Sequence, residues 1–198
     1  MHPEVTTAVP ERLAARGFTL IELMFVVAIA AIFMTLGVPQ MTEFVADQRV
    51  RTATSDIAGE IAFARAKAIE ASRRVYIEKL GASWNNGWRV YADLDNNGAY
   101  TAGANPPEEL KRFDGLPPGR MYVCSPVADF ATNLIFRPDG RIIRTSAAAA
   151  TDGIYVVDPM NGPQAKYKIR GLLFGVSGRV TVVTMNGQAK PCLTAALP

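Results

Sequence analysis

Three oxygen-bearing side chains, Asp93, Asp95 and Asn97, stand at alternate positions in the sequence and are followed by a glycine. Oxygen ligands at this spacing, with a glycine for the sharp turn, open a calcium-binding loop. Such a loop needs a bidentate carboxylate at its twelfth position, which here is Ala104. Glu108 and Glu109 are nearby but out of register. The pattern therefore favours a hairpin loop rich in Asx and glycine residues, with calcium binding as the alternative.

Four basic residues near the C-terminal end, Lys166, Lys168, Arg170 and Arg179, are candidate contacts for nucleic acid. The first three alternate, so in an extended strand their side chains share one face. A basic face can hold DNA phosphates by neutralising their charge, an interaction that salt weakens. The alternative, which is favoured, is a strand face whose charges are solvated. The formal net charge of +3 over 198 residues is weak and does not by itself call for nucleic acid.

Catalytic chemistry has little support in the sequence. The only histidine is His2, and the segment that contains it is predicted below to be removed. The sequence contains no glycine-rich phosphate loop, no metal-spaced set of Cys and His residues, and no nucleophile elbow. We therefore expect no enzyme activity and no cofactor, and a membrane-anchored enzyme is the least favoured of the functions considered.

One carboxylate stands in an unfavourable place, inside an apolar run. Residues 18–38 form 21 residues in which Glu22 is the only ionisable side chain. As a helix this run is roughly 31 Å long, which matches the hydrocarbon core of a bilayer. A carboxylate in hydrocarbon costs about 3 kcal/mol on insertion scales and normally has a partner. If the chain were cut after Gly17, the new amino group of Phe18 on a neighbouring copy could be that partner.

The six residues from Gly17 to Glu22, GFTLIE, resemble the class III signal of type IV prepilins and type II secretion pseudopilins. The resemblance implies that the membrane-embedded prepilin peptidase cuts between Gly17 and Phe18 and methylates the amino group of Phe18. Glu22 matches the family's glutamate. Pro39 matches the proline that commonly bends the helix where it leaves the membrane, so a bend is expected near Gly37 and Pro39. The alternative is an ordinary signal anchor with an incidental glutamate.

The resemblance and the patterning divide the chain into four parts. They are a cleaved leader (residues 1–17), a transmembrane helix (18–38), an amphipathic continuation of that helix (39–72) and a β-rich globular domain (73–198). Basic residues just before the apolar run predict a cytoplasmic N-terminus. We therefore expect a single-pass protein of the bacterial inner membrane with a periplasmic globular domain, which later enters a pilus or pseudopilus.

Residues 39–72 carry apolar side chains at steps of three and four residues, with charged side chains on the opposite face. This stripe predicts a helix that packs one side against a globular domain. Its members are Val50, Ala53, Ile57, Ile61, Ala64, Ala68 and Ala71.

From Val75 onward the apolar period is two, and turn signals rich in Gly, Pro, Asn and Asp separate the segments. Because no helix intervenes, we expect antiparallel sheets packed on the long helix, an α+β fold. The expected strands are residues 74–80, 87–92, 109–113, 120–124, 133–137, 141–145, 153–158, 166–174 and 179–185.

Several landmarks resemble the globular domain of the GspH/FimT group of minor pilins and pseudopilins. They are the segment from Trp84 to Asp93, the hairpin from Phe136 to Arg141, and the late sequence from Gly178 to Val180. The resemblance implies a pilin fold with two β-sheets against the helix. FimT-type minor pilins linked to DNA uptake carry a basic Gly-Arg-x-Arg segment, whereas this chain has Thr181 in place of the second arginine.

The two cysteines, Cys124 and Cys192, would lie in the oxidising periplasm in this reading. A disulfide between them would close a loop of nearly seventy residues. The chain-entropy account gives such a loop roughly 4 kcal/mol of stabilisation. The alternative is a pair of unpaired thiols.

Together these patterns predict a minor pilin or pseudopilin, a passive subunit of a type IV pilus or a type II secretion pseudopilus. The implied partners are the prepilin peptidase, other major and minor pilins or pseudopilins, and an inner-membrane assembly platform. A DNA-binding minor pilin and a tip adhesin are the alternatives. The landmarks fit both machines, and the late Gly178–Val180 strand and Cys192 favour the pilus.

Overall fold

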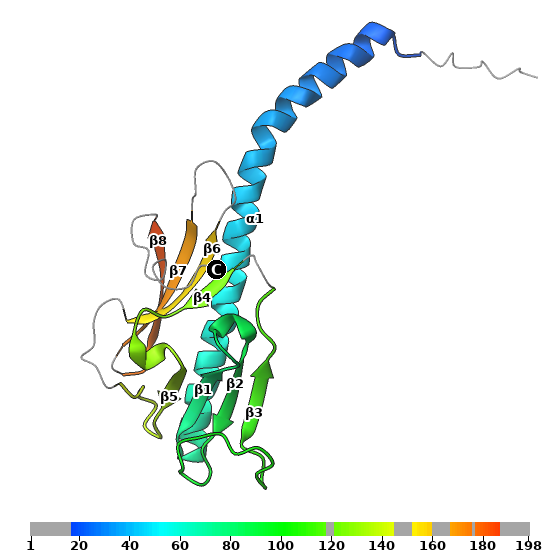
Figure 1. The fold of residues 1–198 in the computed structure, drawn as a ribbon. Helices are drawn as coiled ribbons and strands as arrows, with labels where there is room; N and C mark the ends of the chain where they lie inside the picture. Colours follow the sequence, from blue (N-terminus) through cyan, green and yellow to red (C-terminus); the bar gives the residue numbers. More distant parts are fainter. Residues whose placement is uncertain (1–16, 118–120, 145–151, 160–166, 176, 187–198) are drawn as a thin grey trace, which may run out of the picture. The chain divides into compact units, whose positions relative to one another are not determined.

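A computed structural model describes residues 17–117, 121–144, 152–159, 167–175 and 177–186 (Figure 1). The predicted leader lies outside these residues except for Gly17. The chain divides into two compact units, residues 1–41 and residues 42–198. One helix, α1 (Leu20–Ala71), has 52 residues and belongs to both units.

The described part of the first unit consists of residues 17–19, which are not helical, and the beginning of α1. Large apolar side chains of this unit are exposed, from 52% for Ile29 on the helix to 82% for Phe18 just before it. An exposed row of such side chains is unusual for a protein that stays monomeric in water, and it marks a surface for lipid or for another protein.

The second unit contains two antiparallel sheets of four strands each (Figure 1). The first sheet has the order β3-β2-β1-β5, and the second has the order β4-β6-β7-β8. The strands of the first are β1 (Val75–Lys79), β2 (Trp88–Ala92), β3 (Glu109–Phe113) and β5 (Asn133–Phe136). Those of the second are β4 (Tyr122–Cys124), β6 (Gly153–Pro159), β7 (Tyr167–Phe174) and β8 (Val180–Asn186). Two short 3-10 helices, η1 (Trp84–Asn86) and η2 (Ala128–Phe130), lie in the connections.

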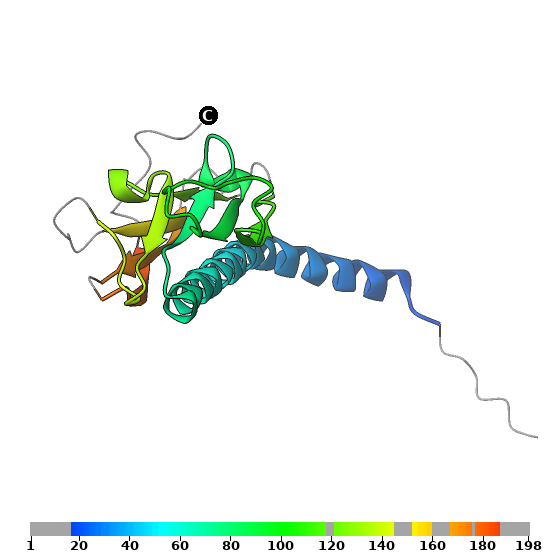
Figure 2. The same cartoon turned by 90° about the horizontal axis from the view of Figure 1, so that it is seen from below.

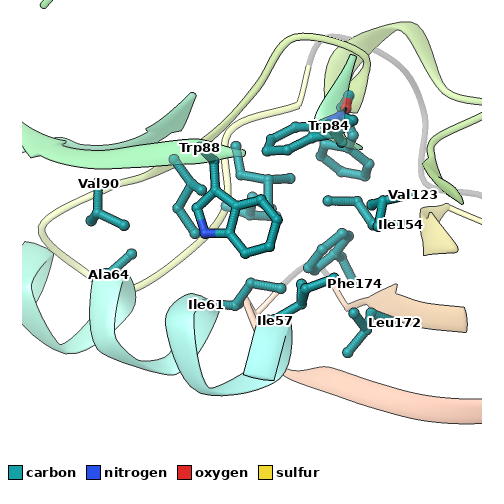
Figure 3. Packing of buried hydrophobic residues seen from close by; sticks show 14 of the residues in the cluster. Ile57, Ile61, Ala64, Trp84, Trp88, Val90, Val123, Ile154, Leu172 and Phe174 are labelled. Carbon is teal, nitrogen blue, oxygen red and sulfur yellow. Dashed lines mark hydrogen bonds between the residues drawn. The ribbon is translucent and has the colours of Figure 1, made fainter. Parts of the chain in front are cut away.

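Both sheets lie on the same side of the helix segment that begins at Thr42, as the turned view shows (Figure 2). The predicted apolar stripe faces them: Val50, Ala53, Ile57, Ile61, Ala64 and Ala68 are buried, whereas Ala71 is exposed at the end of the helix. The core joins helix and sheets through Trp88 and Val90 of β2, Ile154 of β6, and Leu172 and Phe174 of β7 (Figure 3). The predicted α+β fold is therefore confirmed.

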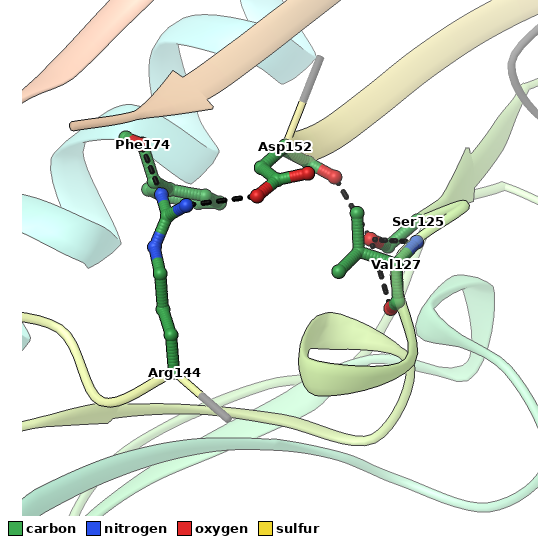
Figure 4. A network of polar contacts seen from close by, with 6 residues as sticks. Ser125, Val127, Arg144, Asp152 and Phe174 are labelled. Carbon is green, nitrogen blue, oxygen red and sulfur yellow. Dashed lines mark hydrogen bonds and ion pairs between the residues drawn. The ribbon is translucent and has the colours of Figure 1, made fainter. Parts of the chain in front are cut away.

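The sequence predicts a strand at residues 141–145, but residues 141–144, the part that the structure describes, do not form one. Only an isolated bridge joins Ile142 to Phe136. Arg144 instead turns into the protein, where its guanidinium lies 2.9 Å from the carboxylate of Asp152 and also donates to the carbonyl oxygen of Phe174 (Figure 4). Both charged side chains are less than a tenth exposed. A buried ion pair of this kind holds its partners in place, since removing one leaves the other charge unpaired.

Candidate functional site

The N-terminal segment is the first candidate site, and Thr19 sets its geometry. The Thr19 hydroxyl oxygen accepts a hydrogen bond from the backbone N–H of Glu22 at 3.3 Å. The Thr19 carbonyl oxygen accepts the first bond of the helix, from the N–H of Leu23 at 3.2 Å. These two bonds are those of a helix N-cap residue, so α1 begins one residue after Thr19. Gly17 and Phe18 precede the helix and are exposed.

Glu22 lies in the first turn of α1 and is exposed. A carboxylate is favoured in this turn because the free N–H groups of the helix end carry partial positive charge. Its exposure leaves the carboxylate accessible to a group on another molecule.

The helix is continuous through Gly37 and Pro39. The bend that the sequence predicts at these two residues stays a prediction.

Among the residues that the structure describes, no helix combines the length and the apolar character that a membrane crossing requires.

The second candidate site is the acidic loop of residues 93–108, which connects β2 to β3. The sequence predicted that Asp93, Asp95 and Asn97 share this loop, and the structure brings Asp93 and Asp95 together with Glu108. One oxygen of each of these three carboxylates lies within 4.8 Å of the others. Oxygen ligands in such a group suit a hard cation such as Ca²⁺.

The same carboxylates also bind the loop's own backbone. Asp93 accepts from the N–H of Asn97 at 3.0 Å and from that of Gly98 at 3.1 Å. Glu108 accepts from the N–H of Leu94 at 3.2 Å and from that of Thr101 at 2.7 Å. Buried carboxylates that accept several N–H bonds can hold a loop in shape without an ion.

Asn97 has a different role from the one that a calcium loop would give it. Its amide nitrogen donates to Asp95 at 2.7 Å, and its amide oxygen accepts from the N–H of Ala99 at 2.7 Å. These bonds are typical of an Asx turn. In the sequence, Glu108 is out of register for a calcium-binding loop. The fold of the loop nevertheless brings its carboxylate close to that of Asp93.

The acidic loop covers an aromatic cluster on the outer side of the first sheet. The ring of Tyr91 stacks on that of Tyr76 with centroids 5.0 Å apart, and Tyr100 of the loop meets Tyr91 edge-on at 5.5 Å. The guanidinium of Arg89 lies 4.2 Å from the centre of the Tyr100 ring. Burial, and secondly the charge of Glu78, raise the pKa of Tyr91 well above its usual range.

The basic residues of β7 face the helix. The amino group of Lys168 lies 3.6 Å from the carboxylate of Glu43, and the guanidinium of Arg170 lies 3.9 Å from that of Asp47. The structure thus places two of the four candidate DNA contacts beside acidic groups of α1. Arg179 is exposed, and Lys166 lies outside the described residues.

Arg65 of α1 joins the two sheets through their turns. Its Nε donates to the carbonyl oxygen of Gly140 at 3.0 Å, and a terminal nitrogen donates to that of Ser177 at 3.3 Å. Gly140 follows β5 of the first sheet, and Ser177 lies between β7 and β8 of the second. No pattern in the sequence indicates this contact, since Arg65 is one of several charged residues on the helix.

Both tryptophans and one of the two cysteines lie among the described residues. Trp84 and Trp88 are buried in the core, and the indole N–H of Trp84 donates to the carbonyl oxygen of Phe130 at 3.1 Å. Cys124 lies on β4. Cys192 lies outside the described residues, so the Cys124–Cys192 disulfide stays a prediction.

Two family models match the chain. Residues 12–38 match the prokaryotic N-terminal methylation motif, and residues 53–175 match the family described as type II transport protein GspH. The second match covers more than half of the chain, so the protein belongs to the GspH family.

No curated protein matches the chain. Among solved structures, the type IV minor pilin FimU of Pseudomonas aeruginosa (strain PAO1) is similar in two crystal forms. The P21 form has a TM-score of 0.47 and 16% identity and covers 71% of this chain and 92% of FimU. The P65 form has a TM-score of 0.44 and 16% identity, with coverage of 68% and 92%.

Proposed function

We propose that this protein is a minor pilin or pseudopilin, a subunit that assembles into a type IV pilus or a type II secretion pseudopilus. One observation carries the proposal: a single chain joins an N-terminal methylation motif at residues 12–38 to a GspH-family domain at residues 53–175. Its role is structural, through assembly with other subunits.

Maturation begins at the N-terminus. The prepilin peptidase cuts between Gly17 and Phe18, removes residues 1–17 and methylates the new amino group of Phe18. The exposed, non-helical conformation of these two residues supports the proposal, because a peptidase needs access to the peptide bond that it cuts. Before assembly, the apolar residues 18–38 anchor the protein in the inner membrane. The domain that follows lies in the periplasm.

Assembly uses the same helix. In a filament, the exposed apolar side chains of residues 18–35 pack against those of neighbouring subunits. The Glu22 carboxylate then pairs with the Phe18 amine of the next subunit, which neutralises a charge that is costly in an apolar environment. The inner-membrane assembly platform and the other pilins or pseudopilins are the partners in this step. A bend at Gly37 and Pro39 and a Cys124–Cys192 disulfide complete the proposed subunit.

DNA binding receives no comparable support. Lys168 and Arg170 lie next to Glu43 and Asp47, so part of their positive charge is already compensated. The basic face of β7 is therefore better explained as a contact between the second sheet and the helix.

The test is to locate the protein in the cell that makes it. Sheared pili, or pseudopili from cells that overproduce them, are purified and compared with the membrane fraction by immunoblotting. We expect the mature protein in the filaments at low abundance, and we expect deletion of its gene to reduce piliation or secretion. Its absence from both kinds of filament, with no effect of the deletion, would overturn the proposal.

A further inference from the structure

Thr19 lies at the boundary between non-helical and helical backbone. Before it, Gly17 and Phe18 are not helical and are exposed, and a Cβ atom added to Gly17 would meet nothing within 4 Å. After it, α1 begins at Leu20. The boundary falls one residue beyond the peptide bond that the peptidase is proposed to cut.

The bonds of Thr19 explain this boundary. At an N-cap, the side-chain oxygen accepts from an N–H that has no partner in the helix, and this fixes where the helix starts. Here that N–H belongs to Glu22, three residues on, which gives the spacing of a capping box. Without the cap, an apolar segment of good helix formers can extend its helix toward Phe18.

The position of the helix start matters for hydrolysis. Cutting the Gly17–Phe18 bond needs a water molecule, whose oxygen enters the new carboxylate of Gly17 while protons pass to the new amine of Phe18. A peptide unit inside a helical turn is engaged in hydrogen bonds and surrounded by neighbouring turns, whereas an extended one is accessible to a protease.

We propose that Thr19 is a positioning residue for leader removal: as the N-cap of α1, it holds the Gly17–Phe18 bond outside the helix. This inference rests on the proposed function, because it presupposes the cut. The cut leaves both bonding groups of Thr19 in the mature chain, so the same cap defines the helix start afterwards. It occupies the backbone N–H of Glu22 and leaves the Glu22 carboxylate exposed for assembly.

The experiment uses full-length protein in detergent micelles with purified prepilin peptidase, and follows leader removal by the shift of the band on a gel. Thr19→Ala removes the cap and favours helix, so we expect cleavage about fivefold slower than in the unmodified chain. Thr19→Ser and Thr19→Asn retain a capping oxygen and should cleave at nearly the original rate.

Thr35→Ala is the matched control. The Thr35 hydroxyl bonds within the same helix, to the carbonyl oxygen of Ile32 at 2.8 Å, and does not cap its start. This variant should cleave normally. In Thr19→Ala, carbon chemical shifts of Phe18 should also move toward helical values, which an altered contact with the peptidase alone would not cause.

Two results would overturn the inference. If Thr19→Ala is cut as fast as the unmodified chain, the cap does not control access. If Thr19→Ser and Thr19→Asn are as slow as Thr19→Ala, the peptidase reads the threonine side chain itself. Failure of the unmodified chain to be cut after Gly17 would instead count against the proposed function.

Discussion

The backbone of Gly178 lies directly against the carbonyl group of Gly140, so closely that a Cβ atom on residue 178 would overlap the Gly140 oxygen. The two glycines belong to turns of different sheets, and both have a φ of +76°. Arg65 of α1 donates to the same Gly140 oxygen. One helix side chain and two glycines thus fix both sheets at one place. This contact gives a physical reason for the late Gly178-Arg179 landmark.

Gly178→Ala should therefore destabilise the domain more than the backbone conformation alone would. Gly103 is a matched control, because its φ is +78° and a Cβ there would meet nothing within 4 Å. We expect Gly103→Ala to cost about 1–2 kcal/mol, from φ alone, and Gly178→Ala to cost about 3 kcal/mol or more. Urea unfolding of the fragment that begins at Thr42 measures both, and equal costs would contradict the close approach.

Glu108→Ala should loosen the acidic loop, because it leaves the N–H groups of Leu94 and Thr101 without their carboxylate. We expect a loss of about 2–3 kcal/mol, and much less for the neighbouring Glu109→Ala, whose side chain is less buried. Thermal unfolding is measured once in EDTA and once with calcium chloride. If hydrogen bonds to the backbone alone hold the loop in shape, Glu108→Ala loses the same stability in EDTA as in calcium chloride. A melting temperature of the unmodified fragment that rises with calcium, and no longer rises in Glu108→Ala, would identify a cation site.

The raised pKa of Tyr91 leads us to expect that the folded protein loses stability in alkali. Its pKa is raised in the folded protein, so the folded state keeps the phenol protonated at pH values where the unfolded chain, with a pKa near 10, ionises. The contribution of Tyr91 to the free energy of unfolding is fully present below about pH 10 and decreases as the pH rises from there. Tyr91→Phe should make the free energy of unfolding fall less steeply between about pH 9.5 and 11.5. Tyr122→Phe, on β4, is the control; an unchanged slope in Tyr91→Phe would contradict the prediction.

The sequence predicts the fold well where periodicity determines burial. Six of the seven residues of the apolar stripe are buried. Steps of three and four residues place them on one face of the helix, and that face packs against the sheets. Sequence spacing also places Lys168 and Arg170 on one face of a strand. It does not reveal that this face lies toward Glu43 and Asp47, since that depends on which side of the sheet packs on the helix.

Sequence spacing does not predict the contacts that form where the chain folds back on itself. The carboxylate of Glu108 lies near that of Asp93 because the connection between β2 and β3 folds back on itself. Arg144 belongs to the strand expected at residues 141–145, but it lies outside any strand, and its buried guanidinium pairs with Asp152. In both cases a polar contact between residues that are not neighbours in the sequence accompanies the local structure that spacing does not predict.

Glu22→Ala tests the proposed pairing in the filament. The substitution makes the apolar run more apolar, so membrane insertion and leader removal should continue as before. Without the carboxylate, incorporation into filaments should fall at least about tenfold, the effect of losing about 1.4 kcal/mol. Immunoblots of filament and membrane fractions measure both steps. Normal incorporation of Glu22→Ala would count heavily against the pairing.

The central claim is that the mature subunit begins at Phe18, and mass spectrometry of the protein from its own cells tests it most directly. The account predicts an N-terminal peptide that starts at Phe18 and carries one added methyl group, and a Gly17→Glu variant that keeps its leader. A functioning pilus or secretion system whose subunit still carries residues 1–17 would contradict it.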